Sequence, residues 1–192
     1  MTERCKMEKL YRQIKEYVPY NRQEAADKRL MLQFMERNPD ALSRENLAGH
    51  FATSAWVVNP QRTKVLMIYH NIYKSWSWAG GHADGEQDLL AVVRREIAEE
   101  TGLTEMKLLC DGIFAINVLT VERHIKKGKV VAGHLHLDVD WLFEADDSLP
   151  LRIKEDENSA VGWVNIADIN TAVNEEKMKP IYALLCEKAE KY

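Results

Sequence analysis

The sequence has few cysteines and no long apolar run. Its three cysteines, Cys5, Cys110 and Cys186, are odd in number and far apart, which argues against a disulfide framework or a cysteine-based zinc site. A reducing cytoplasm is therefore the expected location. No apolar stretch approaches the length of a membrane span, and no basic segment followed by a long apolar run marks a secretory leader.

An excess of positive charge is also missing. Lys and Arg number 26 against 30 Asp and Glu, so the net charge is −4 and no global positive field is available to hold a nucleic-acid backbone. We expect neither a nucleic-acid polymer nor a membrane as a partner. The 192 residues, 46% hydrophobic and 29% charged, are typical of one globular domain with an extension.

The chain changes character near residue 47. Residues 1–46 are predicted to be a helical N-terminal extension, with Leu10, Ile14 and Val18 at four-residue steps, and 47–192 to be the main domain. In that domain β-rich runs surround one central helix, and a last helix is expected from about Asn174. This order predicts a mixed β-sheet packed against helices, in the α/β (α+β) class. The expected strand regions are 51–58, 63–70, 106–120, 130–145 and 159–166.

The central segment, GGHADGEQDLLAVVRREIAEETGL, joins a glycine-rich stretch to an acidic helix. Gly80 and Gly81 are expected to form a loop whose backbone can approach a ligand closely. The helix is predicted from Asp88, with Leu90, Val93 and Ile97 as its apolar stripe. It should end at Thr101-Gly102, because glycine is favoured just beyond a helix C-terminus.

Three glutamates of this helix share one surface. Glu96, Glu99 and Glu100 stand at positions i, i+3 and i+4, which brings their carboxylates together. Glu96 and Glu100 lie beside the apolar stripe, where unpaired carboxylates repel one another and lose hydration. Arg95 can offset one charge and a divalent cation the others; oxygen ligands favour Mg²⁺ or Mn²⁺ over zinc. Taken alone, the three residues fit a solvated surface better than a metal site, because such charge patterns are common on exposed helices; the upstream Gly80-Gly81 and the terminal Thr101-Gly102-Leu103 reverse that preference.

Gly81 together with RREIAEETGL resembles the Nudix box, the signature of the Nudix hydrolases. The resemblance implies an α/β/α sandwich and a pyrophosphatase that cleaves a phosphoanhydride bond in a small nucleoside diphosphate-linked substrate. It implies that Glu96, Glu99, Glu100 and the Gly81 carbonyl bind the metal ions. By the same resemblance Arg95 orients the glutamates, and Glu96 is a candidate base for the attacking water.

One position departs from the family pattern. Gln87 stands where the family has glutamate, and it cannot supply a negative charge. Either the neighbouring Glu86 substitutes through a shifted loop, or one metal ion is held more weakly. Activity is still expected, because the main glutamates are retained.

Further candidates lie outside the box. By the resemblance, Glu157 in the late acidic loop completes the metal site or acts as the base. His82, His136 and Trp78 are candidates for substrate contact, with exposed loop, solvated strand face and core packing as their respective alternatives. The N-terminal helices and the last helix are expected to shape the substrate pocket or a homodimer contact.

Two other functions use the same fold. A sensor that binds a nucleotide derivative without turnover is disfavoured by the retained glutamates and favoured only by Gln87. An isomerase of diphosphate lipids is disfavoured because no cysteine lies near the box, Cys110 being expected in a strand.

Overall fold

The computed structural model describes residues 7–126 and 128–192. The described chain forms two compact units. Unit 1 consists of Met1–Thr53, Gly81–Val92 and Gly112–Asp140, and unit 2 consists of Ser54–Gly80, Val93–Asp111 and Trp141–Tyr192. The prediction that the main domain begins at residue 47 remains a prediction.

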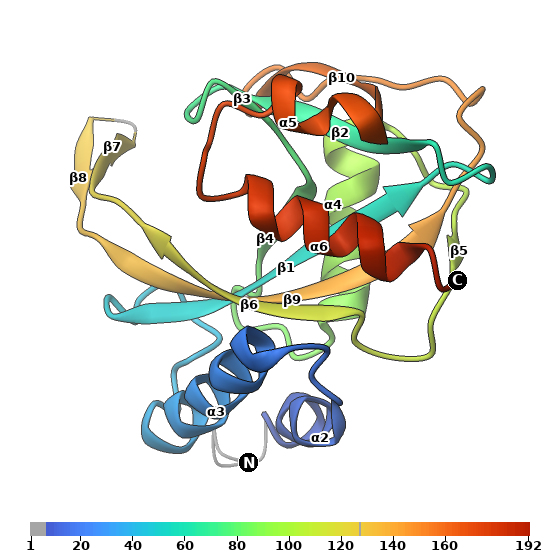
Figure 1. Cartoon of the computed structure of the whole chain (residues 1–192). Helices are drawn as coiled ribbons and strands as arrows, with labels where there is room; N and C mark the ends of the chain where they lie inside the picture. The colour runs from blue at the N-terminus through green and yellow to red at the C-terminus, as the bar shows by residue number, and fades with distance from the viewer. Residues whose placement is uncertain (1–6, 127) are drawn as a thin grey trace. The chain divides into compact units, whose positions relative to one another are not determined.

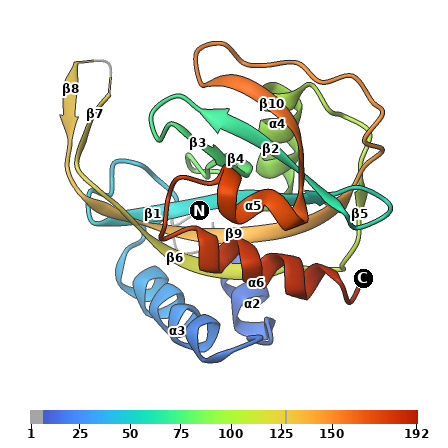
Figure 2. The ribbon, with the colours of Figure 1, turned by 45° about the horizontal axis from the view of Figure 1, so that its top comes forward.

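Unit 1 contains the two N-terminal helices, α2 (Glu8–Glu16) and α3 (Arg22–Arg37), which lie side by side (Figures 1 and 2). Asn21 caps α3 because its side chain accepts a hydrogen bond from Glu24 N at 2.9 Å. The helices are shorter than predicted: turns follow Arg37, and Val18 lies beyond α2 with its side chain 82% exposed. The helical prediction through residue 46 was therefore wrong for its last part.

The strands of unit 1 form a mixed sheet. β9 (His134–Glu144) pairs antiparallel with β6 (Ala115–Val121), and β4 (Ala79–His82) pairs with β1 (Gly49–Val58). β1 and β9 run parallel. Ala48 O accepts a hydrogen bond from Leu135 N, and ten residues further along both strands Val58 O accepts one from Ala145 N. The short strands β7 (His124–Lys126) and β8 (Lys129–Val131) pair as a separate two-stranded sheet.

Unit 2 carries the strand order β10-β2-β1-β9-β5, with β3 beside β2. The predicted antiparallel pairing of the first two strands is confirmed by the register Val58↔Val65. The expected strand over 106–120 is interrupted between β5 and β6. The new elements of this unit are β2 (Lys64–His70), β3 (Ser75–Ser77), β5 (Lys107–Leu108) and β10 (Asn158–Asn165).

Helices cover both faces of the sheet in unit 2 (Figure 1). α6 (Lys179–Ala189) places Tyr182 on Trp56 of β1, with ring centroids 5.3 Å apart. On the opposite face, Arg94 of α4 (Leu89–Thr101) lies over the ring of Phe143 in β9, 5.0 Å from its centroid. The predicted α/β/α sandwich is confirmed. The remaining short helices are η1 (Ile166–Asp168) and α5 (Ile169–Ala172).

The last helix starts later than predicted. It begins at Lys179 rather than near Asn174, and Pro180 occupies its first turn, where a missing N–H costs nothing. Its buried face is formed by Tyr182, Leu185 and Lys188. Among residues 7–126 and 128–192, no helix has both the length and the apolar character needed to cross a membrane.

Candidate functional site

Helix α4 presents the glutamates from a well-defined frame. Asp88 Oδ1 accepts a hydrogen bond from Ala91 N at 3.1 Å at the start of the helix. At the other end Gly102 has φ +75° and donates its N–H to Ala98 O, as predicted for a glycine beyond the last turn. The apolar face differs from the prediction, because Leu89 and Val92 are buried together with Val93 and Ile97, whereas Leu90 is only half-buried.

The three glutamates differ in burial. Glu100 is only 4% exposed, and its Oε2 accepts a hydrogen bond from Gly80 N at 3.0 Å. Glu96 is half-buried and Glu99 is exposed. Burial raises the pKa of Glu100 to about 8, despite the Gly80 hydrogen bond, and the charges of Glu96 and Glu157 add to the shift. The pKa of Glu96 is raised in the same way, first by burial and then by Glu99.

The loop before β10 adds a fourth carboxylate. Lys154 Nζ lies 3.1 Å from Glu99 Oε2 and 3.0 Å from Glu157 Oε2, so it joins the helix to the loop. Behind them, buried Asn158 donates to Glu100 O at 3.0 Å and accepts from Lys154 N at 3.1 Å. The structure thus brings Glu157 to the acidic helix, and its role there stays a prediction.

The electrostatics of this carboxylate group call for a cation. Its members are Glu96, Glu99, Glu100 and Glu157, and Lys154 is the one cation in ion-pair contact with them within the described chain. Arg95 is exposed and makes no hydrogen bond or ion pair with any described residue, although its charge lowers the pKa of Glu96 slightly. Carboxylates are the ligands that hard divalent ions such as Mg²⁺ or Mn²⁺ prefer.

The glycine segment is a strand rather than the expected loop. Gly80 and Gly81 belong to β4, and the left-handed backbone comes later, at Asp84 and Gly85. Gly81 directly follows the residue whose amide binds Glu100. The pairing of β4 with β1 engages one edge of the strand, and the carbonyl of Gly81 stays a candidate ligand.

The departure at Gln87 has a local structural counterpart. Glu86 Oε1 accepts hydrogen bonds from Gln87 N at 2.8 Å and Asp88 N at 3.1 Å, so its carboxylate is engaged by backbone at the start of α4. Whether Glu86 replaces the missing charge stays a prediction.

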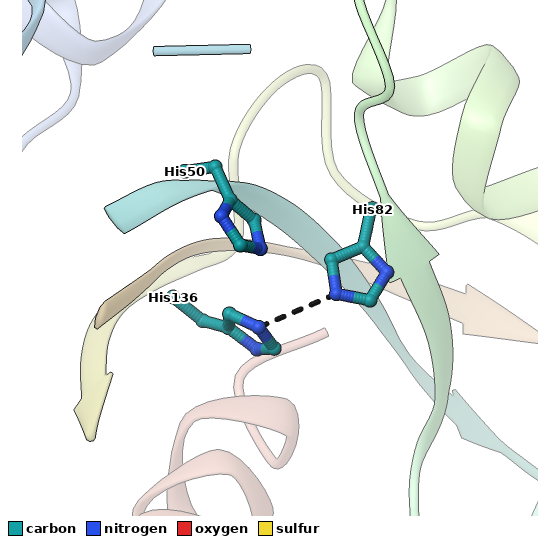
Figure 3. A group of neighbouring side chains, drawn as sticks. All are labelled: His50, His82 and His136. Atoms are coloured by element: carbon teal, nitrogen blue, oxygen red, sulfur yellow. Dashed lines mark hydrogen bonds between the residues drawn. The ribbon is translucent and has the colours of Figure 1, made fainter. Parts of the chain in front are cut away.

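Four histidines lie close together in unit 1: His50, His82, His134 and His136. They are called the histidine group. His50 of β1, His82 of β4 and His136 of β9 each offer one ligand atom, and these atoms lie within 4.8 Å of one another (Figure 3). His82 Nε2 is 3.3 Å from His136 Nε2, and His134 Nε2 is 3.2 Å from the same atom. Burial, followed by the charges of His82 and the other histidines, lowers the pKa of His136 to about 2.

The sequence did not point to His50, because nothing local sets it apart from other polar residues at a strand start. The solvated strand face that is the alternative for His136 does not extend along β9. Asp138 and Asp140 are buried rather than solvated, and Asp140 Oδ2 accepts from Asn117 Nδ2 at 2.6 Å. His82 and His136 contact each other, and their contact with substrate stays a prediction.

Trp78 packs in the core of unit 2. It is 8% exposed, and its ring meets that of Tyr182 edge-on with centroids 5.2 Å apart. Its backbone N donates a hydrogen bond to the Tyr182 hydroxyl at 3.4 Å. This is the core-packing alternative, and it leaves little of the ring available for stacking on a substrate.

Comparison with known proteins gives a consistent picture. A family model described as the NUDIX domain matches residues 49–185. Among solved structures, M. smegmatis RenU, a Nudix hydrolase, superposes with a TM-score of 0.55 at 15% identity, covering 74% of this chain and 88% of that one. An Ap4A hydrolase of C. elegans in a binary complex gives 0.54 at 17% identity, with 73% and 95% covered.

The NUDIX domain of Shewanella oneidensis NrtR, complexed with ADP ribose, gives a TM-score of 0.52 at 19% identity, covering 75% of this chain and 88% of that one. No curated protein matches the chain. At these identities the structural likeness concerns the fold.

Proposed function

We propose that this chain cleaves a phosphoanhydride bond of a small nucleoside diphosphate-linked molecule with Mg²⁺ or Mn²⁺. The premise is that the chain belongs to the Nudix family and is a Nudix pyrophosphohydrolase. The observation that carries the proposal is the burial of Glu100 beside Glu96. A carboxylate 4% exposed, with a raised pKa, is costly to ionise unless a cation accompanies it.

The roles of the chain's own residues follow from their surroundings. Glu96, Glu99, Glu100 and the carbonyl of Gly81 are assigned to hold the ions. A bound divalent ion neutralises phosphate charge, activates water and aligns the attacking and leaving oxygens. Asn158 positions this group, because it ties the carbonyl of Glu100 to the amide of Lys154. Arg95 is retained as the residue that orients the glutamates.

The general base is assigned to Glu96. Its pKa is raised by burial and by Glu99, and a base is most effective when its pKa approaches the working pH. Glu157, by contrast, has its carboxylate engaged in an ion pair with Lys154 at 3.0 Å. Glu157 therefore serves to complete the negative surface around the ions.

The experiment is a substrate panel with the full chain. ADP-ribose, Ap4A, nucleoside diphosphate sugars and nucleoside triphosphates are incubated with Mg²⁺, with Mn²⁺ or with a chelator, and the phosphate products are separated by chromatography. We expect metal-dependent release of a nucleoside monophosphate from at least one substrate. Binding of panel members without turnover would instead support a sensor, and turnover undiminished by the chelator would refute metal dependence.

A further inference from the structure

The histidine group is built by three strands that are neighbours in unit 1. β4 and β9 both pair with β1, and each contributes an imidazole from its end: His82 from β4, His136 from β9 and His50 from β1. The three ring centroids lie 4.9 to 5.2 Å apart. In Figure 3 the rings converge on a common space from three separate segments of the chain.

The spacing of the ring nitrogens suits a tetrahedral ion. Zinc binds imidazole nitrogen at about 2.0–2.1 Å, and two ligands of a tetrahedron at that radius are roughly 3.3–3.4 Å apart. His82 Nε2 and His136 Nε2 are separated by 3.3 Å. The ligand atoms of all three residues, His50 included, lie within 4.8 Å of one another.

His50 supplies a second, independent observation. The residue is 4% exposed, and its buried Nε2 has no hydrogen-bond partner among the described residues. Its other nitrogen, Nδ1, lies 3.4 Å from the carbonyl of Asn46. A ring that donates Nδ1–H to a carbonyl carries its lone pair on Nε2, which is how histidine ligands are usually oriented in metal sites.

Hydrogen bonding alone satisfies this group poorly. His136 Nε2 lies within 3.3 Å of His82 Nε2 and within 3.2 Å of His134 Nε2. His134 Nδ1 is 2.8 Å from the Ala132 carbonyl, which leaves the lone pair of His134 on Nε2 as well. A neutral His136 has at most one hydrogen on Nε2 to share between two neighbours. A metal ion accepts a lone pair from each ring.

The donor set also determines the kind of ion. Neutral imidazole nitrogens suit zinc and other borderline transition ions, whereas Mg²⁺ requires oxygen ligands. The charge of Asp84 raises the pKa of His50. Arg44 already neutralises Asp84, because it donates hydrogen bonds of 2.6 Å to both carboxylate oxygens. The ligands are therefore nitrogens rather than anionic oxygens.

We propose that His50, His82 and His136 bind a divalent transition-metal ion of the zinc type, with His134 adjacent as a fourth imidazole. This site differs from the proposed Mg²⁺ or Mn²⁺ site in its residues and in its ligand chemistry. It does not depend on the proposed hydrolytic function.

The test uses the full chain after chelator treatment and dialysis. Zinc is titrated by calorimetry, and Co²⁺ is titrated by visible absorption, which reports tetrahedral nitrogen coordination. We expect one ion per chain, with Co²⁺ displaced by zinc. The variants His82→Ala and His136→Ala should weaken zinc binding by more than the roughly 10–100-fold that loss of an outer-shell partner costs. His124→Ala is the matched control, since His124 lies in β7 outside the group.

Folding of each variant is checked by circular dichroism. If His50→Ala or His136→Ala fails to fold, His82→Ala decides, because its side chain is only half-buried. Glu100→Gln must retain zinc binding, which shows that the histidine site is separate from the carboxylate group. A failure of the zinc proposal can then be told apart from a failure of the proposed hydrolytic function. Absence of Zn²⁺ and Co²⁺ binding in the unaltered protein, undiminished binding in His82→Ala, or loss of binding in Glu100→Gln would each overturn the proposal.

Discussion

Burial has opposite effects on the pKa values of the carboxylate group in unit 2 and of the histidine group in unit 1. Burial raises the pKa of Glu100 to about 8, whereas burial lowers the pKa of His136 to about 2. In both cases the low-dielectric surroundings disfavour the charged form. Without ions, therefore, burial favours a proton on the buried acid and removes it from the buried base. The carboxylates have to be ionised by a cation, while the imidazoles are already in the ligand form.

The largest expected effect follows from removing the charge of the most buried carboxylate. Glu100→Gln should lower the rate of hydrolysis by more than about 100-fold, because an ion ligand matters more than an outer-shell partner. Product release is measured at saturating Mn²⁺ and substrate. Glu105→Gln is the matched control, an exposed glutamate just after the same helix. An unchanged rate in Glu100→Gln would remove the distinction between the two groups.

The pH dependence of stability should differ in sign between the groups. In chelator-treated protein, Glu100 keeps its proton up to about pH 8, whereas the unfolded chain loses it near 4.5. The native state thus binds more protons in this window, so the free energy of unfolding falls as pH rises, by at most about 1.4 kcal/mol per pH unit. Urea unfolding between pH 6.5 and 8 measures the slope, and Glu100→Gln should flatten it.

Below pH 6.5 the histidine group acts in the opposite direction. The pKa of His136 is depressed from 6.5 to about 2, so below pH 6.5 the unfolded chain binds a proton that the native state does not bind. The free energy of unfolding therefore falls as pH decreases. His136→Ala should weaken this acid-side loss of stability and leave the slope between pH 6.5 and 8 in place. A changed slope between pH 6.5 and 8 in His136→Ala would show that the two groups are not distinct.

An intermediate effect is expected from the residue behind the carboxylates. Asn158→Ala removes donors and acceptors that bind Glu100 O and Lys154 N in a buried setting, which should cost about 1–3 kcal/mol of unfolding free energy. Thermal unfolding gives the stability, and the rate should fall with it because Glu100 loses its support. Zinc binding by the histidine group should stay within twofold. A parallel loss of zinc binding would contradict this separation.

The smallest effect is expected at Lys154. Its partners Glu99 and Glu157 have side chains 46% and 43% exposed, so these ion pairs are screened by water. Lys154→Gln should change the unfolding free energy by less than about 1 kcal/mol. The affinity for Mn²⁺, measured by calorimetry, should rise, since a competing cation has been removed from the carboxylates. Weaker Mn²⁺ binding would show that Lys154 orders the site.

Several site features were predictable because they depend on neighbours in the chain. Helical periodicity places Glu96, Glu99 and Glu100 on one surface, and Gly102 ends the helix in a left-handed conformation, as observed. The short strand β4 was missed because Ala79–His82 lacks the β-branched and aromatic residues that mark strands; its pairing with β1 holds it extended. The start of α6 was placed too early, near Asn174, although Pro180 is typical of a first helical turn, which is where it lies.

By itself, the sequence determined the acidic helix, its end and the resemblance to the Nudix box, since each is written in consecutive residues. Only the tertiary structure decided which glutamate is buried, that Lys154 bridges Glu99 to Glu157, and that His50 meets His82 and His136. The physical reason is that helical geometry repeats every few residues, whereas burial and strand pairing depend on segments far apart in the chain.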